Sequence, residues 1–439
     1  MIYLVPSLHS RGNAMSGLRA LPVLLLFSVQ AAAASPPHWV ASWGASPQAR
    51  WDQSFVLPVG VPASFEQQSV RDVVRLSVGG KRMRIVLSNR YGATPLQVGE
   101  MRVALAGDGA AVMGRSRAVT FGGSANASAA PGAVMVSDPV DLPAGALARL
   151  AITTYYPAHT PVSTFHWGGQ QTPYLANGNA TAAPDLPAAV RFPGRAFLTA
   201  VLVDAPAATR SVVVLGDSIT DGNGSSPDRD RRWTDALARR LAPSGVGVVN
   251  AGISGARLLG DRMGANALAR FDQDVLAQPG VASVIVMMGI NDIGWPGSPF
   301  APRDAAVSAE QVIAAYRQLI ARARSHNLRI VGATLLPFEG ALAGTPFEGH
   351  YSPAKEAVRQ HVNRWIVGSG EFDAVFDADA VLRDPARPSR MRADYDSGDH
   401  LHPGDAGYRA LAQALDVSAL MGNSGRGIEP DGARRRPRR

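Results

Sequence analysis

The sequence predicts two structural halves, an antiparallel β-sandwich followed by an α/β domain built on a parallel sheet. Between Trp39 and about Val203, short alternating apolar segments are separated by turns rich in Gly, Pro, Asn and Asp. After Arg210, apolar strand-like runs alternate with helix-like stripes. Many short strands with frequent turns are typical of a sandwich, and regular alternation of strands and helices is typical of a parallel sheet with helices on both faces.

The first half is expected to contain strands only, because its apolar residues alternate or form short β-branched runs. The clearest strands are residues 69–78, 83–87, 101–105, 118–121, 150–155 and 196–202. We place this all-β domain at residues 35–204, followed by a short linker that contains Pro206.

The second half begins with Ser211-Val-Val-Val-Leu215, a continuous apolar run of the kind that is buried on both faces of a sheet. Helical stripes follow it, and Ser308-Ala-Glu-Gln311 predicts a capping box at the start of one helix. Further strands are expected at residues 246–249, 281–288, 329–336 and 372–376. This domain is expected to span residues 210–420, with its functional site outside the carboxyl ends of the strands.

Composition and charge exclude several function classes. The chain of 439 residues has no Cys, which excludes a disulfide framework, Cys-ligated metal sites and a Cys nucleophile. Its net charge of +8 lies mainly at the ends, with +2 in residues 1–34 and +4 in residues 425–439. Because the body is nearly neutral and has no basic stripe interleaved with aromatic residues, no nucleic-acid partner is expected.

Both ends of the chain are expected to lie outside the folded halves. Arg19, an apolar run over 21–27 and a run of Ala before Ser35 form the parts of a secretory signal peptide over residues 1–34, with Met15 as its start. The run is shorter than the roughly 20 apolar residues of a membrane span. We therefore expect a secreted or periplasmic protein without a membrane span, ending in a disordered Arg-rich tail over 421–439.

Polar residues that can do chemistry follow three of the predicted parallel strands, and a fourth group lies late in the chain. These groups are Gly216-Asp-Ser-Ile-Thr220, Asn250-Ala-Gly-Ile-Ser-Gly255, Gly289-Ile-Asn-Asp292 and Asp399-His-Leu-His402. A Ser hydroxyl needs a base to act as a nucleophile, and a His with a carboxylate three residues earlier can supply one. An Asn amide at the same edge can donate a hydrogen bond to a developing oxyanion.

The four groups, in this order, resemble the sequence blocks of the SGNH (GDSL) hydrolase superfamily, and the resemblance covers about residues 210–418. It implies a flavodoxin-like three-layer fold that needs no metal or organic cofactor. It also implies that Ser218 is the nucleophile, that His402 is the general base and acid, and that Asp399 orients His402. The implied oxyanion-hole donors are the Ser218 N–H, the Gly255 N–H and the Asn291 side chain.

The first half resembles the N-terminal β domain of larger secreted GDSL esterases, including acetylxylan-esterase-like members. Residues 39–46 and 87–91 carry this similarity, which implies a jelly-roll-like sandwich. Together the two resemblances imply a secreted serine esterase that acts on short-chain or carbohydrate acetyl esters, either small molecules or polysaccharides. A lipase or an acyltransferase of the same fold is the alternative. The sequence leaves the oligomeric state open.

Several aromatic residues are candidates for the substrate pocket. Trp295 and Phe300 follow the Asn291 block, and Phe338 follows the fourth strand of the second half. Packing of these rings against the sheet is an equally good interpretation. His166 lies between two aromatic residues, and we interpret it as a core or surface residue of the sandwich rather than as part of a ligand groove.

Two functions from other classes compete with the esterase. Asp217, Asp221, Asn291, Asp292, His400 and His402 are of the ligand types found in two-metal phosphoesterases. However, no Asp-x-His accompanies the first strand of the second half. The other competitor is a non-catalytic carbohydrate-binding protein that uses the β half, which does not account for the four polar groups.

Overall fold

The computed structural model describes residues 36–52 and 54–421. The signal peptide predicted over 1–34 lies outside these residues, and so does the predicted tail apart from Met421, which ends helix α9. From Pro37 onward the described chain forms one structural unit. Among the described residues, no helix combines the length and the apolar character needed to cross a bilayer.

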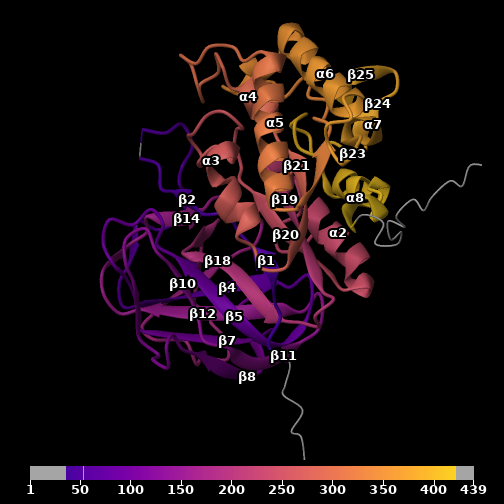
Figure 1. Ribbon diagram of the computed structural model, residues 1–439. Helices are drawn as coiled ribbons and strands as arrows, with labels where there is room; N and C mark the ends of the chain where they lie inside the picture. The colour runs from indigo at the N-terminus through magenta and orange to yellow at the C-terminus, as the bar shows by residue number, and fades with distance from the viewer. Residues whose placement is uncertain (1–35, 53, 422–439) are drawn as a thin grey trace, which may run out of the picture. The chain divides into compact units, whose positions relative to one another are not determined.

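Residues 39–204 form two main antiparallel sheets (Figure 1). The first sheet contains β1 (Trp39–Gly44), β5 (Gly80–Ser88), β10 (Val134–Val136), β11 (Val140–Ala144) and β18 (Leu198–Asp204). The second contains β4 (Gln68–Arg75), β7 (Glu100–Ala106), β8 (Val112–Val119), β12 (Arg149–Tyr156), β15 (Tyr174–Asn177) and β16 (Val190–Arg191). Three smaller sheets complete this half. One contains β2 (Gln48–Ala49), β14 (Thr164–His166) and β17 (Arg195–Ala196). The other two are the pairs β3 (Ser64–Phe65) with β13 (Thr160–Pro161) and β6 (Leu96–Val98) with β9 (Ala127–Ala129).

The connections between the two main sheets confirm a jelly-roll-like sandwich. The chain passes from β1 in the first sheet to β4 in the second, returns to β5, and then runs through β7 and β8 of the second sheet. It crosses back to β11, over to β12 and finally to β18. The resulting orders, β1-β18-β5-β11 and β4-β12-β7-β8, are those of a double Greek key.

The second half has a five-stranded parallel sheet in the order β20-β19-β21-β22-β23, which is the flavodoxin-like order and confirms the predicted fold class. The strands are β19 (Arg210–Gly216), β20 (Val246–Gly252), β21 (Val281–Met287), β22 (Arg329–Ala333) and β23 (Ala374–Phe376). In β19, the side chains of residues 212–215 have no exposed surface, as expected for a strand covered on both faces.

Helices cover both faces of this sheet. The helices are α1 (Ser218–Asp221), α2 (Trp233–Leu241), α3 (Ala267–Phe271), α4 (Ile290–Gly294), α5 (Ala309–Ser325), α6 (Pro353–Gly368), α7 (Ala378–Leu382), α8 (Asp405–Ala414) and α9 (Ser418–Met421), and a small hairpin joins β24 (Arg383–Asp384) to β25 (Arg387–Met391). The chain moves in one direction from β19 to β20 and in the other from β21 onward, so right-handed crossovers place α2 and α5 on opposite faces. The predicted capping box is present at Ser308 and Gln311.

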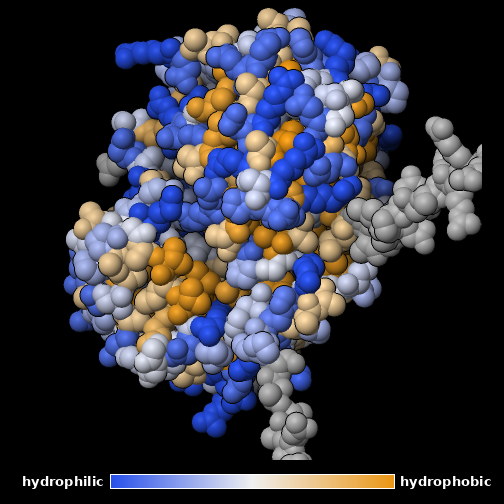
Figure 2. Space-filling view, viewed as in Figure 1, coloured by the Kyte–Doolittle hydropathy of each residue, from blue (hydrophilic) through white to orange (hydrophobic). Residues whose placement is uncertain are grey.

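Each half contributes side chains to the apolar core of the other. Val86 and Leu202 of the sandwich belong to the core cluster that surrounds the parallel sheet. In return, Trp295 and Phe300 belong to the cluster that fills the sandwich. On the surface, Figure 2 shows apolar side chains gathered over the region of β10 and β18, where Val134 and Val136 are about half exposed.

Candidate active site

A sharp turn at the end of β19 places Ser218 at the first position of the one-turn helix α1. Asp217 caps this helix, because its carboxylate accepts a hydrogen bond of 3.0 Å from the Ile219 N–H. Gly216 is required at the end of the strand, since a Cβ there would lie 2.0 Å from the Thr220 hydroxyl oxygen. The turn therefore depends on Gly216 and Asp217, and the Ser218 hydroxyl lies at the carboxyl edge of the sheet, where ligands of such sheets bind.

The structure brings Ser218, His402 and Asp399 together in one hydrogen-bonded chain. His402 Nε2 lies 2.7 Å from Ser218 Oγ, and His402 Nδ1 lies 2.6 Å from Asp399 Oδ2. Because a carboxylate only accepts, Nδ1 carries the proton and Nε2 offers its lone pair to the Ser218 hydroxyl. The side chains of Ser218 and His402 are almost completely buried. This geometry suits transfer of the Ser218 proton to His402.

Asp399 is held in its ionised form. Burial by itself would raise its pKa, but the hydrogen bond from the His402 ring and the two from the backbone N–H groups of Leu401 and His402 outweigh burial and bring the pKa well below its usual range. An ionised Asp399 fixes the His402 tautomer and stabilises positive charge on the ring when it takes up a proton.

The other predicted oxyanion-hole residues, Asn291 and Gly255, lie beside each other. Asn291 Nδ2 donates a hydrogen bond of 3.0 Å to the carbonyl of Ala256, the residue after Gly255. Gly255 has a φ of +72°, and a Cβ there would lie 2.3 Å from the sulfur of Met263 and 2.8 Å from the Trp295 ring. Only glycine therefore fits at this position.

Trp295 orients Asn291, a role that the sequence did not reveal. Its indole N–H donates a hydrogen bond of 3.1 Å to Asn291 Oδ1, so the amide nitrogen turns toward the Gly255 turn. Trp295 stacks on Phe300, with ring centroids 4.7 Å apart. Phe338 instead packs edge-on against Tyr351. All three rings proposed as pocket walls are nearly fully buried, and their pocket role stays a prediction.

Two further carboxyl groups next to the site have raised pKa values. Burial raises the pKa of Asp217 to about 7, although the hydrogen bond from Ile219 opposes the shift. Burial also raises the pKa of Asp292 to about 6, against hydrogen bonds from the N–H groups of Leu258 and Leu259. Through these two bonds, Asp292 ties the segment after Gly255 to the helix that carries Asn291.

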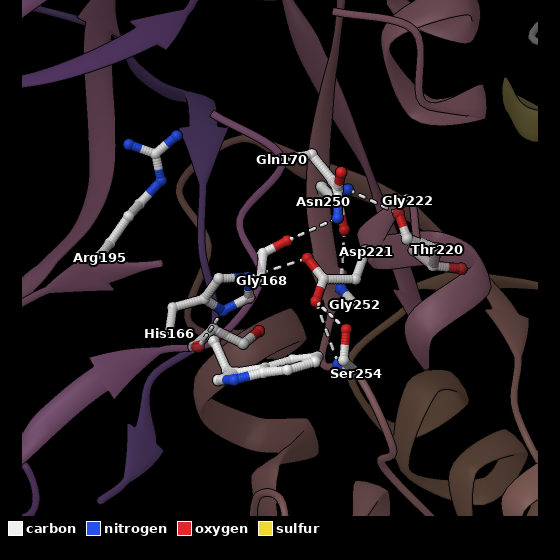
Figure 3. Close-up of polar contacts among 12 residues, drawn as sticks. His166, Gly168, Gln170, Arg195, Thr220, Asp221, Gly222, Asn250, Gly252 and Ser254 are labelled. Atoms are coloured by element: carbon white, nitrogen blue, oxygen red, sulfur yellow. Dashed lines mark hydrogen bonds and ion pairs between the residues drawn. The ribbon is translucent and has the colours of Figure 1, made fainter. Parts of the chain in front are cut away.

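The sequence interpretation of His166 was incomplete. His166 is buried, but it lies at a contact between the halves rather than within the sandwich core, and its Nε2 is 2.9 Å from Asp221 Oδ1 (Figure 3). Asp221 in turn accepts hydrogen bonds from the backbone and hydroxyl of Ser254, the residue before Gly255. His166 ends strand β14 and Asp221 ends helix α1, and the two lie 55 positions apart, so no local spacing connects them.

The side chains proposed as metal ligands take part in other contacts. His400 Nδ1 pairs with Asp396 at 2.5 Å, and Asp221 pairs with His166. Within residues 36–52 and 54–421, no group of three or more His, Cys, Asp or Glu side chains is arranged to hold a metal ion.

Residues 214–410 match the model of the GDSL-like lipase/acylhydrolase family. No curated protein matches the chain. Among solved structures, a carbohydrate acetylesterase family member from Sinorhizobium meliloti is similar, with 19% identity over 48% of this chain and 99% of that one and a TM-score of 0.38. A GDSL-like lipase from Bacteroides thetaiotaomicron is similar as well, with 19% identity over 47% of this chain and 85% of that one and a TM-score of 0.35.

The family match spans β21 and β22 together with the blocks that contain Ser218, Gly255, Asn291 and His402. The second half of this chain is thus a domain of the GDSL-like lipase/acylhydrolase family, and the protein is an enzyme of the SGNH hydrolase type.

Proposed function

We propose that this protein is a serine esterase that cleaves carboxylic esters through an acyl-enzyme on Ser218. The observation that carries the proposal is the unbroken chain from Ser218 Oγ through His402 to Asp399, with contacts of 2.7 and 2.6 Å. Such a chain activates a hydroxyl that is otherwise a weak nucleophile at neutral pH.

The reaction has two halves. His402 Nε2 takes the Ser218 proton while Oγ attacks the ester carbonyl, and the tetrahedral oxyanion is stabilised by the N–H groups of Ser218 and Gly255 and by Asn291. His402 then gives the proton to the departing alcohol, which leaves an acyl group on Ser218. A water molecule that loses its proton to His402 attacks this acyl group, and the carboxylic acid leaves as His402 returns the proton to Ser218 Oγ.

We propose short-chain or carbohydrate acetyl esters as the substrates. Trp295, Phe300 and Phe338 are almost fully buried, so these rings offer little free apolar surface to a long acyl chain. The apolar run and the Ala-rich segment within residues 1–34 support export of the enzyme to the periplasm or the medium.

A panel of aryl esters with acyl chains of two to sixteen carbons, together with acetylated xylan, tests the proposal on the wild type and on Ser218→Ala. We expect the wild type to favour the shortest chains, to be indifferent to a chelator, and to lose turnover by about 10⁴-fold or more in Ser218→Ala. Full activity of Ser218→Ala combined with loss upon chelation would establish a metal-dependent hydrolase instead. Lack of turnover of every ester by the wild type would favour a binding protein.

A further inference from the structure

The β half contacts the active-site region through the segment that follows β14. From His166 to Thr172, this segment runs alongside residues 221–230 of the second half. His166 bonds to Asp221, Gln170 Nε2 donates to Asn223 Oδ1 at 3.2 Å, and Thr172 bonds to Asp228 through both its N–H and its hydroxyl. Figure 3 shows the bond between His166 and Asp221.

His166 is held at both ring nitrogens by acceptors. Nδ1 lies 2.9 Å from the carbonyl oxygen of Ser46, and Nε2 lies 2.9 Å from Asp221 Oδ1. A carbonyl oxygen only accepts, so Nδ1 carries a proton. Asp221 Oδ2 accepts hydrogen bonds from two donors of Ser254, at 2.6 Å from the hydroxyl and 3.1 Å from the backbone N–H. These two contacts fix the orientation of the His166 ring, with Nε2 toward Asp221.

This arrangement is a buried contact between an imidazole and a carboxyl group that spans the two halves. The side chains of His166 and Asp221 are only 6% and 2% exposed, respectively. Removing His166 would leave the buried Asp221 carboxyl group without one of its hydrogen-bond partners, which is costly. Arg195, also drawn in Figure 3, bonds to Asp72 and Gln171 rather than to Asp221.

Asp221, whose carboxyl group contacts His166, also contacts the segment that contains the Gly255 N–H of the oxyanion hole. Asp221 is the last residue of α1, whose first residue is Ser218, and its other oxygen fixes Ser254 next to Gly255. Gly168 lies against the same place, since a Cβ there would be 3.8 Å from the Ser254 hydroxyl. Asp221 therefore links α1 to the turn that presents the Gly255 N–H.

We propose that His166 of the β half is a positioning residue for the oxyanion hole: it fixes Asp221, which holds Ser254 and thereby the backbone N–H of Gly255. This inference rests on the proposed esterase function. It gives the sandwich a role in the reaction, because the ring that orients Asp221 comes from the β half and not from the α/β domain.

The test compares His166→Gln, Ser254→Ala and the double variant with wild type on p-nitrophenyl acetate and butyrate, with rates normalised to sites titrated by a fluorophosphonate. A full oxyanion-hole donor contributes about 10²–10³-fold to kcat, so a displaced one is expected to lower kcat by about 10-fold. KM should change little, and the loss should be equal for both esters, because the oxyanion does not depend on acyl length. Thr172→Val is the matched control, since it loses a bond between the same two segments that does not lead to Ser254.

The double variant separates positioning from general loss of stability. His166 and Ser254 both act through Asp221. The loss of kcat in the double variant should therefore equal the larger loss of the two single variants, and it should not equal the product of the two losses. A normalised kcat of His166→Gln within about twofold of wild type, even with a lower Tm, would overturn the proposal. If His166→Gln does not fold, Ser254→Ala removes a single hydroxyl, and its unchanged kcat would overturn the proposal equally. Failure of the esterase function itself is distinguishable, because the wild type would then turn over neither ester.

Discussion

Two Asp–His pairs flank helix α1, and they differ in what the second ring nitrogen faces. At its start, His402 is bound to Asp399 and turns its other nitrogen to the hydroxyl of Ser218. At its end, His166 is bound to Asp221 and turns its other nitrogen to the carbonyl of Ser46. A hydroxyl can give up a proton and a carbonyl cannot, so only the first pair can carry a proton to and from a substrate.

The two pairs also differ in the exposure of their carboxylates and in where their His residues lie in the chain. The Asp399 side chain is 36% exposed and lies three residues before its His, whereas the Asp221 side chain is 2% exposed and its His comes from the other half of the chain. Chemical identity thus does not assign a role to an Asp–His pair. The role depends on the group that the second ring nitrogen faces and on access to the reacting atoms.

The largest expected effect comes from removing the carboxylate charge from each pair in turn. Asp399→Asn should lower kcat by about 10⁴-fold, because the amide donates to the ring and imposes the wrong tautomer on His402. Asp221→Asn should lower kcat by only about 10-fold, because it weakens the positioning of the Gly255 N–H without touching the proton relay. Steady-state rates per titrated site measure both. Equal losses of kcat in the two variants would contradict the different roles given to the two pairs.

Asn291→Ala is expected to have the next largest effect. It removes an oxyanion donor, so kcat should fall by about 10²-fold or more while substrate binding survives. Steady-state kinetics on p-nitrophenyl acetate separate kcat from KM. An Asn291→Ala enzyme with a higher KM and an unchanged kcat would contradict this assignment.

Trp295→Phe provides the matched control for Asn291. It keeps an aromatic ring next to Phe300 but loses the N–H that holds Asn291 Oδ1. A hydrogen bond of this kind contributes about 0.5–1.5 kcal/mol, so kcat should fall by only about 2- to 12-fold.

Asp217, finally, is expected to affect stability rather than rate. Burial raises its pKa in the folded protein to about 7, whereas an unfolded Asp titrates at about 3.9. Between these two values the folded state binds the extra proton, so raising the pH through this window lowers the free energy of unfolding, by at most about 1.4 kcal/mol per pKa unit. This decrease in the free energy of unfolding is absent below about pH 4 and has its full, constant value above about pH 7.

Asp217→Asn keeps the oxygen that caps α1 but cannot ionise. The Tm of the variant relative to wild type should therefore rise from about pH 4 to about pH 7 and then level off. Thermal unfolding of both proteins across this range measures the difference, in which the other titrating groups cancel. A Tm difference that does not vary with pH would show that Asp217 is ionised throughout.

The fold class and the central site residues could be predicted from the sequence because their signals are local. The apolar run of β19 and the blocks around Ser218, Asn291 and His402 each lie within a few consecutive residues. The contact of His166 with Asp221 and the bond from Trp295 to Asn291 depend on how separate segments pack. Neither Trp295 nor His166 stands in a pattern that reveals its partner. From the sequence alone, packing of Trp295 against the sheet is therefore an equally good interpretation, and we interpret His166 as a core or surface residue.

Side chains of each half pack in the apolar core of the other half, and this limits which domains can be joined in a hybrid enzyme. Val86 and Leu202 complete the packing around the parallel sheet, and Trp295 and Phe300 complete the packing inside the sandwich. A hybrid enzyme made by joining a foreign β domain at residues 205–209 would leave voids in both cores, and voids of this kind destabilise a protein in proportion to their volume. We therefore expect the two halves to unfold together, and recombination between relatives to succeed only when both halves are exchanged together.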